Sequence, residues 1–389
     1  MLPTNDSVQT VNPRLALLET PALLLDEAKM RLNIARLVQR IGPMGPILRP
    51  HLKTVKSLDI ARLLLSGGTG PATVSTLSEA EAFAAAGVNN IIYAVGITPQ
   101  KLGRVAAIRA AGCDLSVLVD SVEQARAVAE ASTRFKQVIP ALIELDCDGH
   151  RGGVHPADPK VVQIGRTLVD GGAELRGVLT HAGGSYSASG REAHAASAEQ
   201  ERKAAVDGAK MLRAAGLPCP VVSIGSTPTA HAVEDLEGIT EVRAGVYVFF
   251  DLVQAGIGVC DVKDIALSVL TTVIGHQYDK GWILTDSGWM ALSQDRGTAS
   301  QKLDQGYGLV CDESGAVLSD LIVIDASQEH GIIACRPGSG TKAPHLPVGS
   351  RLRILPNHAC SMASQFNHYN VIPADPEAPL KMWPRFGGW

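Results

Sequence analysis

Between residues 28 and 251, short apolar runs alternate with stretches of helical character, and this alternation restricts the fold more than any other feature. The runs are rich in Val, Ile and Leu and do not alternate with polar residues, as expected for parallel strands covered on both faces. The expected strands are residues 47–53, 72–77, 90–96, 114–120, 138–146, 174–182, 221–226 and 242–250. Eight strands in this pattern predict an α/β fold with a closed (β/α)8 barrel. The open doubly wound sheet is the alternative, but no GxGxxG segment opens the first helix.

Helix starts are expected where a Ser precedes a Glu or Gln by three residues. Ser78 with Glu81, and Ser121 with Gln124, fit this N-cap pattern. The Ala-rich stretch 195–215 predicts a long helix by propensity.

A change of pattern after residue 251 predicts a second domain. Long helical stretches disappear, and β-branched and apolar runs separated by Gly and Pro occupy residues 266–274, 282–285, 319–324, 331–335 and 351–355. Such runs predict a mostly β domain. A further apolar run at 20–26 is expected to pair with it. The predicted division is therefore a barrel at 28–255 and a β-rich domain formed by 1–27 together with 256–389.

Composition excludes several classes of function. The 389 residues carry a net charge of −4 without a basic block, which disfavours nucleic acid as a partner. Seven cysteines, an odd number without a CxxC pair, favour a reducing compartment. The first residues lack a cationic segment followed by an apolar one, and no run of about twenty apolar residues occurs. We therefore expect a cytoplasmic protein without a membrane partner.

Lys53 is the first candidate for chemistry. It lies in ILRPHLKTVK at the end of a predicted buried strand, two residues after His51. A lysine amine forms Schiff bases with carbonyl compounds, pyridoxal phosphate (PLP) among them, when its surroundings make it less basic. The alternative is a surface lysine whose stem covers apolar atoms.

A candidate anion site follows the seventh and eighth predicted strands, in VSIGSTPTA and RAGVYVFFD. In barrels of this kind the loops after these two strands, with a helix N-terminus, commonly bind phosphate. Gly225 permits close approach of the backbone, and Ser226 and Thr227 offer hydroxyls and amides at a helix start. Gly245 and Tyr247 would complete the cradle. The alternative is an ordinary N-cap turn.

Polar residues also follow the fifth and sixth strands, in ELDCDGHRGGV and LTHAGGSY. Arg151 is suited to bind a phenolate oxygen, and Tyr186 and His181 lie where catalytic groups collect in this fold. Each could instead cap a loop, and Asp146 and Asp148 could simply pair with Arg151.

His358 and Cys360 form a candidate metal pair in LPNHACSMA. On an extended segment, side chains two residues apart lie on the same face. Imidazole and thiolate suit zinc, and two protein ligands leave positions for water and substrate. The alternative is coincidence, because Cys is often a core residue.

Taken in order, these segments resemble the fold-type III PLP enzymes related to alanine racemase, in the branch of D-serine dehydratase and D-threonine aldolase. The likeness runs through most of the chain. Its most specific segments are PHLKTVKS, VSTLSEAE, LTHAGGSY, VSIGSTPT, EVRAGVYVFFD, DSGWMALSQDRGT, QEHG and PNHAC.

The resemblance implies specific roles. Lys53 would hold PLP as the internal aldimine and remove the Cα proton, Arg151 would contact the phenolic oxygen, and Tyr186 would approach the pyridine nitrogen. His358 and Cys360 would hold a divalent metal, with zinc as the first candidate and manganese as another. The phosphate would be bound by Gly225, Ser226, Thr227, Gly245 and Tyr247. The family also implies a homodimer.

The implied reaction is the dehydration of a D-3-hydroxy amino acid, such as D-threo-3-hydroxyaspartate or D-serine, to a 2-oxo acid and ammonia. The aldolases of the family usually carry an H-x-D segment where this chain has Cys360, which weakens the alternative of a retro-aldol reaction. A racemase, with Tyr307 as second base, and a non-catalytic PLP-binding protein are further alternatives. Lys56, Arg296 and His330 are equal candidates for binding a distal carboxylate.

Overall fold

The structure, a computed structural model, describes residues 14–389 except for the side chain of Ser66. These residues form two compact units. One comprises Lys29–Asp264 and Pro384–Trp389, and the other comprises the chain up to Ala28 together with Ile265–Trp383. Residues 256–264 and 384–389, which the sequence assigned to the β-rich domain, therefore belong to the first unit.

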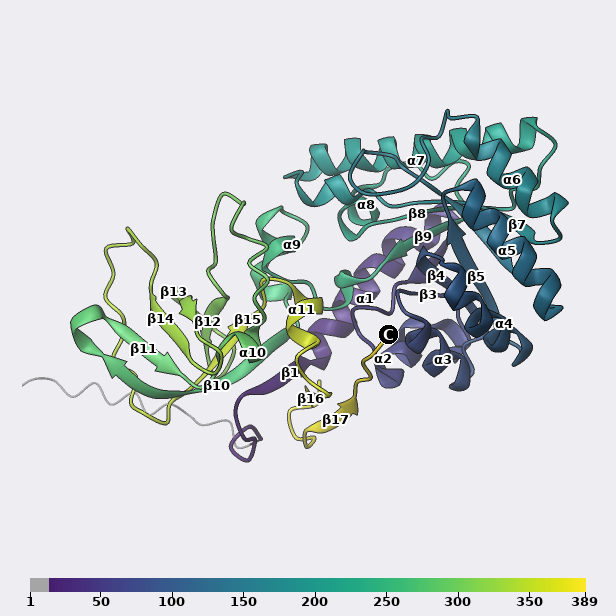
Figure 1. Cartoon of the computed structure of the whole chain (residues 1–389). Helices are drawn as coiled ribbons and strands as arrows, with labels where there is room; N and C mark the ends of the chain where they lie inside the picture. The colour runs from purple at the N-terminus through teal and green to yellow at the C-terminus, as the bar shows by residue number, and fades with distance from the viewer. Residues whose placement is uncertain (1–13) are drawn as a thin grey trace, which may run out of the picture. The chain divides into compact units, whose positions relative to one another are not determined.

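The first unit is the expected (β/α)8 barrel (Figure 1). Its parallel strands lie in the order β2-β9-β8-β7-β6-β5-β4-β3, and a bridge between His51 and Thr73 spans the remaining gap between β2 and β3. The strands are β2 (Ile47–Pro50), β3 (Ala72–Val74), β4 (Asn90–Gly96), β5 (Asp114–Val119), β6 (Pro140–Leu145), β7 (Glu174–Thr180), β8 (Val221–Ile224) and β9 (Glu241–Ala244). The helices are α1 (Glu27–Ile41), α2 (Leu58–Leu64), α3 (Leu77–Ala85), α4 (Leu102–Ala110), α5 (Val122–Phe135), α6 (Lys160–Asp170), α7 (Arg191–Ala214), α8 (Thr227–Ala232) and α9 (Leu252–Gly256).

Most barrel strands end earlier than the apolar runs that predicted them. β2 ends at Pro50, so Lys53 lies in a turn beyond the strand. β9 ends at Ala244, and the apolar residues after it form a helical turn in which Tyr247 is fully buried. A run of apolar residues in a sequence indicates that they are buried, and not that they are all in a strand. Here the buried residues continue past the end of the strand.

One predicted helix start is right and the other is wrong. Ser121 caps α5 by accepting the backbone N–H of Gln124 at 3.2 Å. The cap of α3 lies two residues before the predicted one, because Thr76 accepts the N–H of Glu79 at 3.0 Å. The long Ala-rich helix is confirmed as α7, a helix of 24 residues.

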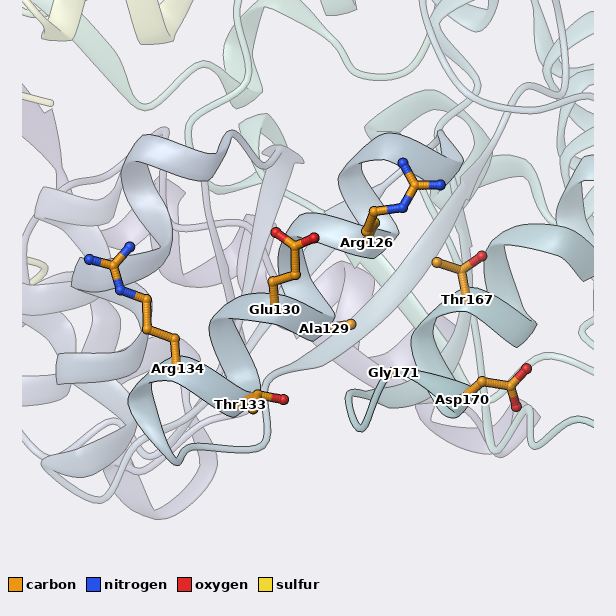
Figure 2. Close-up of a pocket in the computed structure, with 8 residues that line it drawn as sticks. All are labelled: Arg126, Ala129, Glu130, Thr133, Arg134, Thr167, Asp170 and Gly171. Carbon is orange, nitrogen blue, oxygen red and sulfur yellow. The ribbon is translucent and has the colours of Figure 1, made fainter.

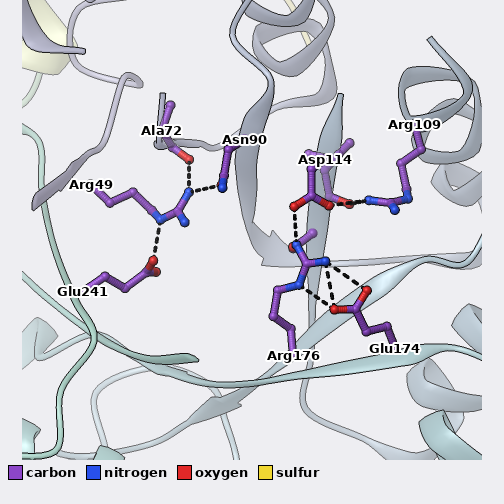
Figure 3. A network of polar contacts seen from close by, with 10 residues as sticks. Arg49, Ala72, Asn90, Arg109, Asp114, Glu174, Arg176 and Glu241 are labelled. Carbon is purple, nitrogen blue, oxygen red and sulfur yellow. Dashed lines mark hydrogen bonds and ion pairs between the residues drawn. The ribbon is translucent and has the colours of Figure 1, made fainter. Parts of the chain in front are cut away.

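Two groups of paired charged side chains lie on the barrel strands (Figure 3). The guanidinium of Arg49 donates to Glu241 at 2.8 Å and to the Asn90 side chain at 2.8 Å. A second cluster joins Arg176 to Asp114 at 2.6 Å. Arg49 and Glu241 are buried, and buried charges are tolerated when they are paired in this way, whereas Arg176 and Asp114 are partly exposed.

The second unit is a mostly antiparallel sheet of nine strands. Its strands are β1 (Ala22–Asp26), β10 (Leu267–Gln277), β11 (Trp282–Thr285), β12 (Leu309–Asp312), β13 (Val317–Ala326), β14 (Gly331–Cys335), β15 (Arg351–Leu355), β16 (His368–Ile372) and β17 (Lys381–Pro384), with the short helices α10 (Trp289–Leu292) and α11 (Ala359–Ala363). Because β10 pairs with both β11 and β15, six strands form a closed ring. β1 pairs with β10 and β16, as the sequence predicted for residues 20–26.

Two further expectations concern the whole chain. All seven cysteines lie within the described residues, and all are free thiols. None of the helices in the described part is long and apolar enough to cross a membrane.

Candidate active site

The turn that carries Lys53 is built by short backbone hydrogen bonds directly after β2. Leu52 donates to the Thr73 carbonyl at 2.8 Å, and the amides of Val55 and Lys56 both donate to the Leu52 carbonyl, at 3.1 and 2.9 Å. The Lys53 side chain is exposed, whereas Leu52, Thr54 and Val55 are fully buried. The turn therefore presents one amine at the C-terminal end of the barrel, where catalytic groups of this fold lie.

Two histidines close to this lysine are held in the neutral form. Burial, together with the nearby positive charges of Lys53 and Arg243, lowers the pKa of His181 to about 3. Burial likewise moves the pKa of His51 well below its usual value, helped by the same two charges. The His181 Nδ1–H donates to the Gly225 carbonyl at 2.8 Å, which fixes the ring against the end of β8. Lys53 thus faces neutral imidazoles.

Two glycines, Gly225 and Gly245, allow close backbone contacts in the predicted phosphate cradle. Gly225 has φ +149°, and a Cβ there would collide with the Arg243 carbonyl. A Cβ at Gly245 would lie 3.0 Å from the His51 carbonyl oxygen. Each glycine therefore permits an approach between neighbouring strand ends that a larger residue would block.

Ser226 and Thr229 form a capping box at the start of α8. The Ser226 hydroxyl accepts the Thr229 N–H at 3.2 Å, and the Thr229 hydroxyl accepts the Ser226 N–H at 3.1 Å. Ser226 Oγ also lies 2.9 Å from Ser185 Oγ, which links the loop after β7 to α8. The amide and hydroxyl of Ser226 thus form hydrogen bonds inside the cradle that fix its conformation.

The hydroxyls of Thr227 and Tyr247 are buried and have no hydrogen-bond partner among the described residues. A buried polar group without a partner destabilises a protein unless a ligand or water satisfies it. Burial also raises the pKa of the Tyr247 phenol, so this group remains a donor at neutral pH. Two orphaned donors beside a glycine-lined cradle at a helix start fit a phosphate group.

Glu201 organises this cradle and was missed by the sequence analysis. Its carboxylate is fully buried and accepts the N–H of Ala182 at 2.9 Å, the N–H of Gly225 at 2.9 Å and the hydroxyl of Thr229 at 2.7 Å. Burial raises the pKa of this carboxyl group. The signal was present in the sequence, because Glu201 falls in the buried stripe of α7 that contains Ala198 and Ala205.

Arg243 is a second residue that the sequence analysis missed. It is buried on β9 and donates to Ser223 Oγ at 2.6 Å and to the Thr180 carbonyl at 2.5 Å. Burial lowers its pKa to about 10, so it keeps its positive charge at neutral pH. This charge lies near His181 and contributes to lowering the pKa of its ring.

Arg151 and Tyr186 follow β6 and β7, as predicted. The Arg151 guanidinium is exposed and lies 3.3 Å from Glu144 Oε1, whereas the sequence offered Asp146 or Asp148 as its partner. Asp146 instead accepts the N–H of Asp148 at 3.1 Å. The Tyr186 ring centroid is 6.4 Å from that of His181, so the tyrosine belongs to the group around Lys53.

His358 and Cys360 lie in the second unit, in a conformation that the sequence did not predict. His358 is extended, but α11 begins at Ala359, so Cys360 is in the first turn of a helix and not on an extended segment. His358 Nδ1 is 2.7 Å from Asp295 Oδ2, and Ser361 donates to the same carboxylate oxygen at 3.0 Å. The hydrogen bond from His358 lowers the pKa of Asp295.

This donor set fits a divalent cation. A metal-bound histidine commonly gives its other ring nitrogen to a carboxylate, which is the arrangement of His358 and Asp295. A cation would bind Nε2, because Nδ1 faces Asp295. Within residues 14–389 no group of three or more His, Cys, Asp or Glu side chains is placed to hold a metal, so water or substrate would complete the coordination.

The outside of the barrel carries a separate groove that none of these residues line (Figure 2). It has a volume of about 610 Å³ between α5 and α6 and is bordered by Arg126, Ala129, Glu130, Thr133, Arg134, Thr167, Asp170 and Gly171. Its charges are mixed and its shape is open, so we do not assign chemistry to it.

Comparison with known proteins gives two family matches. Residues 25–253 match the alanine racemase N-terminal domain, and residues 266–372 match the putative serine dehydratase domain. The chain is 53% identical to D-threo-3-hydroxyaspartate dehydratase of Delftia sp. (strain HT23), over 96% of this chain and 98% of that protein. It is 28% identical to D-serine dehydratase of Dictyostelium discoideum, over 97% of this chain and 99% of that protein.

The solved structure of the Delftia dehydratase has the same fold, with a TM-score of 0.92 and 52% identity over 96% of this chain and 99% of that one. Another solved structure is of a D-threo-3-hydroxyaspartate dehydratase with a cysteine-to-alanine mutation, in the metal-free form. Aldolases of 3-hydroxy-D-aspartate also resemble the chain, at lower identity than the dehydratase from Delftia.

Proposed function

Because this chain belongs to the family that joins an alanine racemase N-terminal domain to a putative serine dehydratase domain, we propose that it is a PLP- and metal-dependent dehydratase of D-3-hydroxy amino acids. The first candidate substrate is D-threo-3-hydroxyaspartate, which would give oxaloacetate and ammonia. D-serine, which would give pyruvate and ammonia, is the second. The reaction is that of a carbon–oxygen and ammonia lyase.

PLP, when bound, supplies an electron sink that stabilises negative charge at the substrate Cα. Lys53 would hold the cofactor through its amine and move the Cα proton. Thr227 and Tyr247 would donate their unpaired hydroxyls to the phosphate, while Gly225, Ser226 and Gly245 form the surface around it. Arg151 would bind the phenolic oxygen, and Tyr186 would approach the pyridine nitrogen.

The environment of Lys53 suits proton transfer. His51 and His181 remain neutral at physiological pH because burial and the charge of Arg243 lower their pKa values. Neutral imidazoles do not compete with the lysine for a negatively charged ligand, and their low pKa values leave Lys53 as the group that would take up the proton.

His358 and Cys360 would hold the divalent metal, with zinc as the first candidate and manganese as another. Such a cation would act as a Lewis acid on the substrate's β-hydroxyl and make hydroxide a better leaving group. Asp295 would orient His358 for this task. The metal-free form reported for a cysteine-to-alanine mutant of a D-threo-3-hydroxyaspartate dehydratase supports a metal-binding cysteine.

The retro-aldol reaction is the second candidate function, since aldolases are among the relatives. Dehydration is favoured because the chain is most similar, among the relatives described above, to a dehydratase along nearly its whole length. We also propose a cytoplasmic homodimer, the assembly that the family resemblance implies.

The observation that carries the proposal is the pair of orphaned hydroxyls, Thr227 and Tyr247, in a glycine-lined cradle on the same barrel end as Lys53. The decisive experiment incubates the enzyme separately with D-threo-3-hydroxyaspartate, D-serine and D-threonine and measures products. Ammonia with a 2-oxo acid supports dehydration. Glycine with an aldehyde would establish the aldolase instead, and an L-amino acid would establish a racemase.

A further inference from the structure

The last residues of the chain, Pro384–Trp389, belong to the same compact unit as the barrel. The backbone N–H of Phe386 donates to the carbonyl of Lys56 at 3.0 Å. Lys56 is the residue whose own amide closes the turn onto Leu52. The C-terminal segment therefore bonds directly to the end of the turn.

The conformation of Lys56 requires support from its surroundings. Its φ of +42° lies in the left-handed region, which residues other than glycine adopt at an energetic cost. Its ammonium group lies 3.0 Å from Glu79 Oε1, and the other oxygen of Glu79 accepts the Ser75 N–H at 2.8 Å. The side chain and the carbonyl of Lys56 are thus both held from outside the turn.

One face of α3 provides both supports. Glu79 and Phe83 are four residues apart, so they lie on the same side of the helix. Glu79 contacts Lys56, while Phe83 makes an edge-to-face contact with Phe386, with ring centroids 5.0 Å apart. Phe83 is fully buried. The helix therefore aligns the C-terminal segment with the turn.

Two further bonds fix the end of the segment to the barrel helices. Ser78 on α3 donates to the backbone oxygen of Trp389, and Arg104 on α4 donates to the same oxygen at 3.3 Å. The Trp389 side chain itself is 90% exposed. Attachment therefore depends on the Phe386 ring and on backbone atoms, and not on the Trp389 ring.

We propose that Pro384–Trp389 is a positioning element for the reaction, a clasp that holds the Lys53 turn in the geometry needed to bind PLP. This inference rests on the proposed function, in which Lys53 is the PLP lysine. The clasp does not touch substrate. It acts through Lys56, three residues after Lys53, and through the face of α3 that carries Glu79 and Phe83.

The test compares Phe386→Ala with the wild type in the full-length protein. Hydrogen exchange of the peptide that contains Leu52–Lys56 is expected to become about three- to tenfold faster, because removing an aromatic contact makes local opening easier. PLP titrated into the cofactor-free protein is expected to bind several-fold more weakly. The conservative variant Phe386→Leu is expected to restore most of both properties.

Two control variants separate the clasp from general effects. Trp389→Ala removes an exposed ring and keeps the backbone oxygen, and Phe135→Ala removes a partly exposed phenylalanine at the end of α5. Both are expected to leave the exchange of Leu52–Lys56 and the affinity for PLP unchanged.

The outcomes also separate this proposal from the proposed function. If Phe386→Ala leaves exchange and PLP affinity at wild-type values while Lys53→Ala abolishes PLP attachment, the clasp is overturned and the proposed function stands. If the wild-type protein attaches no PLP to Lys53, the proposed function is overturned, and the clasp loses its role in positioning whatever the exchange rates.

Discussion

The Glu201 carboxylate accepts the backbone N–H of Gly225 at 2.9 Å, inside the loop that the sequence assigned to phosphate binding. The Gly225 amide is therefore engaged by a side chain of α7 and does not point to a phosphate. Because the same oxygen also accepts the N–H of Ala182, one buried carboxylate fixes the ends of two neighbouring strands. The cradle is shaped from behind by a residue that would not contact the cofactor.

Replacing Glu201 by Ala is expected to weaken PLP binding. Three buried donors would lose their acceptor, which costs about 1–3 kcal/mol per unsatisfied group, so a loss of about tenfold or more in affinity is expected. Glu201→Gln keeps one carbonyl oxygen, so its affinity for PLP should lie between that of the wild type and that of Glu201→Ala. Titration of the cofactor-free proteins with PLP measures the effect. The control is Glu199→Ala, which removes a partly exposed ion pair with Arg202 on the same helix and should bind PLP normally.

Replacing Lys53 by Ala is expected to abolish both activity and the visible absorbance of the lysine-bound cofactor, because Lys56, the other lysine of this turn, is paired with Glu79. Borohydride reduction followed by mass spectrometry should find the pyridoxyl mark on Lys53 in the wild type alone. Lys203→Ala, on the exposed face of α7, should behave as the wild type. A Lys53→Ala protein that retains colour and turnover would remove the central assignment.

Removing the metal is expected to suppress turnover and leave PLP bound. Cys360→Ala should have the same effect as a chelator, because only one protein ligand from the pair would remain. Metal content by mass spectrometry and PLP absorbance are measured on the same sample. Cys335→Ala, a partly exposed free thiol of the same unit, is the matched control. Full activity in verified absence of metal would contradict the role of the pair.

Acidification is expected to destabilise the barrel through His181. The pKa of His181 is about 3 in the folded protein and has its unperturbed value of 6.5 in the unfolded chain. Between these two pH values only the unfolded chain binds a proton at this residue. Stability is therefore complete above about pH 6.5 and falls as the pH drops, by at most about 1.4 kcal/mol per pH unit for this residue. His51 acts in the same direction. Thermal unfolding at several pH values should show a shallower dependence in His181→Gln than in the wild type.

Breaking the interior ion pair is expected to destabilise the fold. Glu241→Gln would leave the Arg49 guanidinium buried without its carboxylate, a change that typically costs about 3–5 kcal/mol. Denaturant unfolding of the variant measures the loss. The exposed pair Arg62 and Asp59 provides the contrast, since Asp59→Asn should change stability by less than about 1 kcal/mol.

Much of the fold could be predicted from the sequence. Unbroken Val, Ile and Leu runs identified all eight barrel strands, because burial on both faces leaves a clear pattern. Their ends could not be predicted, since the apolar residues around Tyr247 are buried in a turn and look the same in sequence as strand residues. β12, β16 and β17 were missed, because short strands within a continuous antiparallel sheet carry weak signals.

The candidate site could be predicted only in part. Lys53, Gly225 and Thr227 stand out because each follows a strand and has a chemical reason to be there, and their roles remain predictions. Glu201 and Arg243 were missed, since a charge in a helix stripe or on a strand gives no sign of its partners. The helical position of Cys360 was also missed, because His-x-Cys has no marker that distinguishes a strand from a first helical turn.

The pairing of β1 with β10 and β16 affects how the chain can assemble. Strand β1 is synthesised before the barrel, and its two neighbours in the sheet are synthesised after it. Contacts between residues so distant in sequence form slowly. During translation the barrel can fold while neither edge of β1 has a strand to pair with. A partly folded intermediate, or its binding by a chaperone, would be most readily detected in this state.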